Sequence, residues 1–183
     1  MTLNQTEGNL EIEYKFWADD LSMEEFHDRV ESVIGGRVKP FYVVSCDDYY
    51  IREDSEDFVR YRKGGGTTEL TLKFKRKQNT VRKEINLNVT GNDDMSIVEF
   101  LKLGGYKKAF SVFKEAWIYH TEECDASYYT LSDGRSVVEV EAVNPATVKE
   151  GVQVIDRWSD ILRLEDLKRE TRSLFEIFTE EME

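Results

Sequence analysis

The chain has 183 residues, of which 40% are hydrophobic and 12% aromatic, a composition typical of one globular domain. Its formal net charge of −12 at pH 7 repels nucleic-acid phosphates at long range, which argues against a long nucleic acid as a partner. No stretch approaches the roughly 20 apolar residues of a membrane-spanning helix, so no membrane partner is expected. Any anion-binding site must therefore be built locally.

The N-terminus and the cysteines bear on the cellular compartment. Residues Met1 to Gly8 are polar and lack the basic and apolar regions of a signal peptide. Cys46 and Cys124 are too few for a disulfide framework, and both are expected to be reduced packing residues. These features predict a cytoplasmic protein. They do not bear on its oligomeric state, which stays open between a monomer and a homodimer.

The first half of the chain predicts strands and one helix. Leu10 to Trp17 alternates apolar and charged residues, which is the period-two pattern of a strand. Ser22 and Glu25 have the spacing of a capping box and open an amphipathic helix that Gly35 ends. Further strands are predicted by alternation and by the intervening turn residues; they are Phe41–Ile51, Phe58–Arg62, Glu69–Lys77 and Arg82–Val89.

The second half predicts one short helix, more strands and a helical end. Ser96 and Glu99 form another capping box, and the short helix that they begin stops at Gly104. The next predicted strands are Phe110–His120, Tyr128–Leu131 and Ser136–Ala142. Apolar residues then recur at helical spacing over about residues 145–183. The economical interpretation is a single α+β domain over residues 1–183, with the helical part packed on the sheet.

Several predicted strands have one apolar and one charged face. The charged faces carry Glu11, Glu13 and Lys15; Arg60 and Arg62; Lys73 and Lys75; Arg82 and Glu84; and Glu139 and Glu141. An open sheet with one solvated face would show the same alternation. However, Glu-x-Glu occurs near both ends of the sheet region and basic pairs fill the strands between. Clustered carboxylates favour a hard divalent cation, and facing basic side chains would match a polyphosphate.

At these positions the sequence resembles the CYTH family of triphosphate tunnel metalloenzymes, which includes class IV adenylyl cyclase and thiamine triphosphatase. Glu11-Ile12-Glu13-Tyr14-Lys15 is similar to the ExExK signature of that family. Other similar motifs follow in the family's order across most of the chain: Asp47-Asp48-Tyr49-Tyr50, Arg60-Tyr61-Arg62, Leu72-Lys73, Arg82-Lys83-Glu84, Leu103-Gly104-Gly105-Tyr106, Val112-Phe113-Lys114 and Val138-Glu139-Val140-Glu141. The ordered set is much more specific than any one motif.

The resemblance implies a closed eight-stranded antiparallel β-tunnel with helices packed outside, Mg²⁺ or Mn²⁺ as the cofactor, and a small-molecule triphosphate as the substrate. It assigns metal binding to Glu11, Glu13, Glu139 and Glu141. It assigns phosphate binding to Lys15, Arg60, Arg62, Lys73, Lys75, Arg82 and Lys114. Lys15 and Glu84 are the expected catalytic residues, with Glu84 orienting its basic neighbours.

The chain also departs from the family pattern. Glu115 and Ala116 follow Lys114 where many members have K-x-R, and Asn86 stands where a second carboxylate is usual. The aspartate that often precedes the last hairpin is replaced, and Asp125 or Asp133 could substitute for it.

The metal-binding carboxylates are all present, so we expect a metal-dependent hydrolase of tripolyphosphate, a nucleoside triphosphate or thiamine triphosphate. The alternatives are a class IV-type adenylyl cyclase that makes cyclic AMP and a non-catalytic binder of a nucleotide or polyphosphate. An RNA 5′-triphosphatase is a related option, which the net charge of −12 disfavours.

Overall fold

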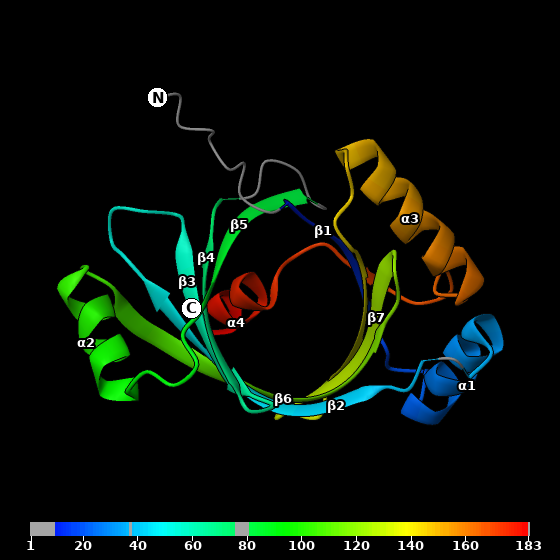
Figure 1. Ribbon diagram of the computed structural model, residues 1–183, viewed down its shortest axis with the longest axis horizontal. Coiled ribbons are helices and arrows are strands. Elements are labelled where there is room, and N and C mark those ends of the chain that lie inside the picture. Colours follow the sequence, from blue (N-terminus) through cyan, green and yellow to red (C-terminus); the bar gives the residue numbers. More distant parts are fainter. Residues whose placement is uncertain (1–9, 37, 76–80, 183) are drawn as a thin grey trace.

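A closed ring of eight antiparallel strands forms the body of the protein (Figure 1). The computed structural model describes residues 10–36, 38–75 and 81–182. Around the ring the strands follow the order β5-β4-β3-β2-β6-β7-β8-β1, and β1 pairs back with β5. Their bounds are β1 Leu10–Trp17, β2 Phe41–Ile51, β3 Phe58–Gly64, β4 Thr67–Lys73, β5 Val81–Asn88, β6 Lys107–His120, β7 Cys124–Leu131 and β8 Ser136–Ala142. This confirms the predicted eight-stranded tunnel.

Strand β1 closes the ring because it uses both of its edges. Its residues from Glu13 to Trp17 pair with β8, whereas Leu10 to Ile12 pair with β5. Further along β1, after the residues that pair with β5, Lys15 and Phe16 pair with the two-residue strand β9, Arg169–Glu170. The register of β1 with β8 sets Glu13 beside Glu141 and Lys15 beside Glu139. Two Glu-x-Glu segments that are far apart in sequence are therefore neighbours in the tunnel wall.

Three helices lie outside the ring in Figure 1: α1 (Met23–Ile34), α2 (Asp94–Leu103) and α3 (Val148–Ile161). The Ser22 hydroxyl accepts a hydrogen bond from the Glu25 amide at 3.1 Å, as the capping box predicts. Helix α2 begins earlier than predicted, because Asp93 rather than Ser96 is its N-cap. No helix in the described ranges has the length and apolar content needed to cross a membrane.

The last helix, α4 (Leu174–Met182), differs from the expectation that all helices pack outside. Figure 1 shows it within the ring of strands. The Phe175 ring stacks on the Phe58 ring with centroids 4.1 Å apart and also contacts Tyr49 and Phe110. Leu174 and Ile177 complete this apolar cluster together with inward-facing strand residues. Helix α4 thus fills one end of the tunnel with apolar side chains.

Two strand boundaries differ from the prediction in ways that affect the site. Strand β4 ends at Lys73 rather than Lys77, so Lys75 follows the strand; Lys77 and the turn after it fall among residues 76–80, outside the described part. Strand β7 begins at Cys124 rather than Tyr128. The earlier start places Asp125 in the tunnel wall, where β7 pairs with β8.

Truncation of the Phe175 ring tests the packing of α4 in the tunnel. Phe175→Ala should lower the free energy of unfolding by about 3 kcal/mol, because it removes an aromatic side chain from a packed apolar cluster. Phe100→Ala on α2 is the matched control, since that ring is 71% exposed and its loss should cost less than about 0.5 kcal/mol. Urea denaturation measures both. Equal effects of the two substitutions would contradict this account of α4.

Candidate functional site

A cavity of about 470 Å³ runs inside the ring of strands. Acidic and basic side chains both line it. Alternate residues of a strand share a face, and the charged faces of β1, β3, β4, β5 and β8 point into the ring. Every predicted site residue lines this cavity except Lys75. Lys75 is exposed instead and its amine pairs with Glu56 at 2.5 Å, since the strand has already ended at Lys73. The assignment of Lys75 to phosphate binding is therefore not supported by its position.

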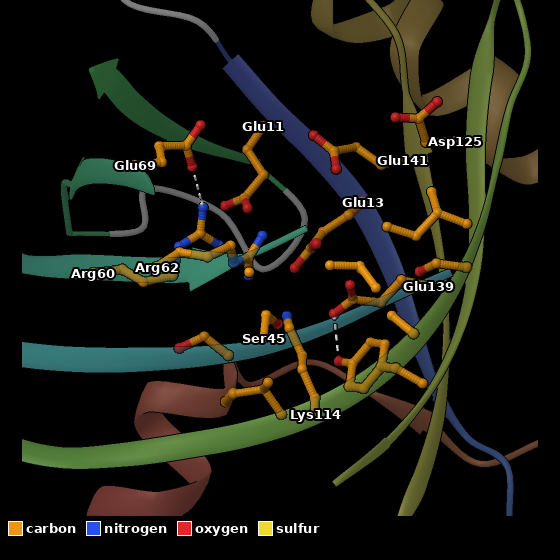
Figure 2. Close-up of a pocket in the computed structure, with 18 of the residues that line it drawn as sticks. Glu11, Glu13, Ser45, Arg60, Arg62, Glu69, Lys114, Asp125, Glu139 and Glu141 are labelled. Carbon is orange, nitrogen blue, oxygen red and sulfur yellow. Dashed lines mark hydrogen bonds and ion pairs between the residues drawn. The ribbon is translucent and has the colours of Figure 1, made fainter. Parts of the chain in front are cut away.

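Four carboxylates from β1 and β8 converge on one side of the cavity and are here named the acidic group. Figure 2 shows Glu11, Glu13, Glu139 and Glu141 pointing toward the basic residues of the opposite wall. Burial raises the pKa of Glu141 well above its ordinary value, and the negative charges of Glu11 and Glu13 raise it further. Glu141 thus lies where a cation would be stabilised.

The other carboxylates of this group are paired with lysines. The Lys15 amine lies 3.0 Å from Glu13 and 2.5 Å from Glu139. Burial lowers the pKa of Lys15, but the two carboxylates outweigh burial and hold the pKa above its ordinary value. Glu11 pairs in the same way with Lys73. Among the described residues, no three acidic, histidine or cysteine side chains are arranged as a ready metal cluster.

Glu84 lies beside Lys73, one of the basic residues that it is expected to orient. It lies 2.8 Å from the Lys73 amine, which also pairs with Glu11. The Asn86 amide donates a hydrogen bond to Glu84 at 2.7 Å. Burial raises the pKa of Glu84, yet Lys73 and the Asn86 hydrogen bond bring it below its ordinary value. Asn86, which replaces a carboxylate in the family pattern, therefore helps to hold Glu84 ionised.

The basic residues on β3, β4 and β6 that line the cavity are here named the basic wall; they are Arg60, Arg62, Lys73 and Lys114. Asp47 binds two of them, a role that was not predicted from its sequence motif. Its fully buried carboxylate accepts two hydrogen bonds from the Arg62 guanidinium, at 2.6 and 2.7 Å, and lies 3.3 Å from the Lys114 amine. Burial opposes ionisation of Asp47, but Arg62 and Lys114 hold its pKa well below the usual range. The signal in the sequence was the Asp47-Asp48-Tyr49-Tyr50 motif itself.

The protonated amine of Lys114 is destabilised by its surroundings. Burial lowers its pKa to about 8, and the positive charge of Arg62 contributes to the shift. Two polar groups on the same side of the cavity lack a hydrogen-bond partner within the described part of the chain. The Ser45 hydroxyl and Arg60 Nε are buried and have no hydrogen-bond partner among the described residues. Buried donors of this kind are costly unless a ligand or water satisfies them.

Of the two aspartates considered as substitutes, only Asp125 lines the cavity. It pairs across the strands with Glu141, and Figure 2 shows the two carboxylates near each other. Asp133 lies in the turn before β8 and pairs with Arg135 at 2.5 Å. Asp125 is therefore the aspartate that could join the acidic group.

The low pKa of Lys114 predicts a dependence of stability on pH. The unfolded chain should bind this proton up to about pH 10.4, whereas the folded chain loses it near pH 8, so wild-type stability should rise between these values. Lys114→Gln should remove that rise and raise the free energy of unfolding at pH 7 by about 1 to 3 kcal/mol. Lys75→Gln is the exposed control and should change neither. Chemical denaturation from pH 6 to pH 10 provides the comparison, and a Lys114→Gln variant less stable than wild type at pH 7 would refute the assignment.

Comparisons with known proteins agree with the fold and the motifs. A protein of Pyrococcus horikoshii OT3 superposes with a TM-score of 0.75 at 22% identity, covering 91% of this chain and 98% of its own. A protein of Vibrio parahaemolyticus, proposed to be an adenylate cyclase, gives a TM-score of 0.74 at 17% identity over 94% and 99% of the two chains. The Mimivirus capping enzyme triphosphatase gives 0.51 at 10% identity over 85% and 90%.

At these identities the structural likeness concerns the fold. A search of curated proteins finds no significant match. The family model for the CYTH domain matches residues 9–174, which is most of the sequence and includes every predicted site residue. The chain therefore belongs to the CYTH domain family.

Proposed function

We propose that this protein is a divalent-metal-dependent hydrolase of a small-molecule triphosphate. The observation that carries the proposal is the meeting of an acidic group on β1 and β8 with a basic wall on β3, β4 and β6 inside one cavity. A linear triphosphate carries negative charge along its whole length, so it needs cations on several sides. The buried unsatisfied donors of Ser45 and Arg60 give further support, because phosphate oxygens would satisfy them.

The acidic group suits Mg²⁺ or Mn²⁺ by its chemistry. Carboxylate oxygens are the donors that these hard cations prefer, and the raised pKa of Glu141 indicates that the group accepts positive charge. Glu11, Glu13, Glu139 and Glu141 would hold the ion, with Asp125 beside them. When bound, the ion would supply charge neutralisation and polarisation of the phosphate oxygens.

The basic residues would bind the phosphates by exchanging partners. Lys15 and Lys73 already pair with carboxylates of the acidic group, so a cation at those carboxylates would release both amines toward the substrate. Arg62 stays oriented by its two hydrogen bonds to Asp47. Lys73 would lose its pairing with Glu11 but keep that with Glu84, which would orient its amine. This arrangement favours negative charge that builds on the leaving phosphate, an effect often worth several kcal/mol in such sites.

Cyclisation of ATP would use the same residues and is the second candidate, because the Vibrio parahaemolyticus protein of similar fold was proposed to be an adenylate cyclase. Attack by a ribose hydroxyl on the α-phosphate would release pyrophosphate and cyclic AMP, whereas hydrolysis releases orthophosphate or pyrophosphate without a cyclic product. The products formed from ATP therefore distinguish the two reactions.

The test is release of phosphate from tripolyphosphate, ATP, GTP and thiamine triphosphate, each with Mg²⁺, Mn²⁺ or a chelator. We expect turnover of at least one substrate that the chelator abolishes. Glu141→Gln should lower kcat/KM about 100-fold or more, because it removes a charge from the metal-binding group. It should leave the free energy of unfolding unchanged or higher, since it also removes a buried charge that its neighbours repel.

Glu115→Gln on the exposed outer face of β6 is the control and should retain wild-type activity. Tight triphosphate binding without turnover would instead indicate a binding protein, and cyclic AMP from ATP would indicate a cyclase. Full activity of the Glu141→Gln variant would remove Glu141 from the metal site.

A further inference from the structure

One stretch of the cavity wall is apolar, and phosphate or metal binding gives it no role. Phe41 and Val43 of β2 and Ala116 and Ile118 of β6 all line the cavity. The register pairs Phe41 with Ile118 and Val43 with Ala116, so the four side chains form one continuous strip, here named the apolar strip. Although it lies within the cavity, Phe41 is 50% exposed. An exposed aromatic surface inside a binding cavity favours an apolar or aromatic ligand group.

The apolar strip and α4 lie on opposite sides of the basic wall. Along β2, the inward-facing residues run Tyr49, Asp47, Ser45, Val43 and Phe41 in succession. Tyr49 contacts Phe175 of α4, and Ser45 pairs across the strands with Lys114. Four residues of strand, about 13 Å, separate the level of Ser45 from that of Phe41. A triphosphate held by the basic wall would therefore direct any attached group away from α4 and along the apolar strip.

Polar groups border the outer end of the apolar strip. The His120 ring is 6.5 Å from the Phe41 ring at an angle of 40°, and His120 Nδ1 lies 3.0 Å from Asp125. Gly65, in the turn between β3 and β4, approaches so closely that a Cβ there would be 3.3 Å from the Phe41 ring. The Phe41 ring offers a face for stacking, and Asp125 beside His120 offers one carboxylate that can accept a hydrogen bond from an N–H donor.

We propose that the apolar strip and His120 bind an amine-bearing aromatic ring attached to the triphosphate. The substrate class is then a ring-bearing triphosphate, such as a nucleoside triphosphate or thiamine triphosphate, rather than inorganic tripolyphosphate. This inference rests on the proposed triphosphate site. It adds that Phe41 selects among triphosphates, while the basic wall binds what they share.

Phe41 and Tyr42 provide a matched pair of variants. The two rings are adjacent in β2 and 50% and 49% exposed, but Tyr42 faces outward, where its ring contacts Trp117 at 5.0 Å. We would measure dissociation constants by calorimetry with Mg²⁺ for ATP, thiamine triphosphate and tripolyphosphate. Phe41→Ala should weaken binding of at least one ring-bearing ligand about tenfold, the usual scale for loss of one stacking contact. Its affinity for tripolyphosphate should stay within about twofold of wild type, which also shows that the variant is folded.

Tyr42→Ala should bind all three ligands as wild type does, and Phe41→Tyr should restore ring binding because it keeps the aromatic face. The ligand with the larger loss in Phe41→Ala identifies which ring the apolar strip accepts. Equal changes for tripolyphosphate and both ring-bearing ligands, or no change for any, would overturn the inference and leave the triphosphate site intact. If wild type binds none of the three, the proposed function fails and the inference fails with it.

Discussion

The pairing of β1 with both β8 and β5 is the constraint on which the rest of the structure depends. An open sheet would leave its polar face in water, where ion pairs contribute little. Closure turns that face inward and brings both Glu-x-Glu segments together through the register of Glu13 with Glu141. It also sets Arg82 beside Glu11, where β1 meets β5. The acidic group and the basic wall then share one enclosed space.

Enclosure makes charge balance the main physical problem of the interior. Lysines compensate three of the four expected metal-binding glutamates, and Asp47 compensates Arg62 and Lys114. The compensation is incomplete, because Glu141 has a raised pKa and Lys114 a lowered one. A cation near Glu141 and an anion near Lys114 would relieve both, which is the combination that a metal–triphosphate complex offers. The apolar end filled by α4 and the apolar strip lie on opposite sides of this charged zone.

Much of the fold could be predicted from the sequence, since strand periodicity depends on local side-chain alternation. The eight strands and the closed tunnel were expected and are present. Local patterns failed where tertiary contacts decide boundaries. Lys75 shares the period of Lys73, but β4 ends before it, and Asp125 belongs to β7 although no alternation identified it. Helix α4 carries an apolar pattern like that of any packed helix, which does not indicate the inside of a tunnel.

By itself the sequence determined which side chains share a face of each strand, and its ordered motifs indicated the family, because both are properties of neighbours along the chain. Only the tertiary structure decided which faces meet. The pairing of Asp47 with Arg62 and Lys114 joins three strands, and the stacking of Phe175 on Phe58 joins a C-terminal helix to an early strand. Such contacts depend on ring closure and strand register, which are set by the whole sheet and are not encoded in any one segment.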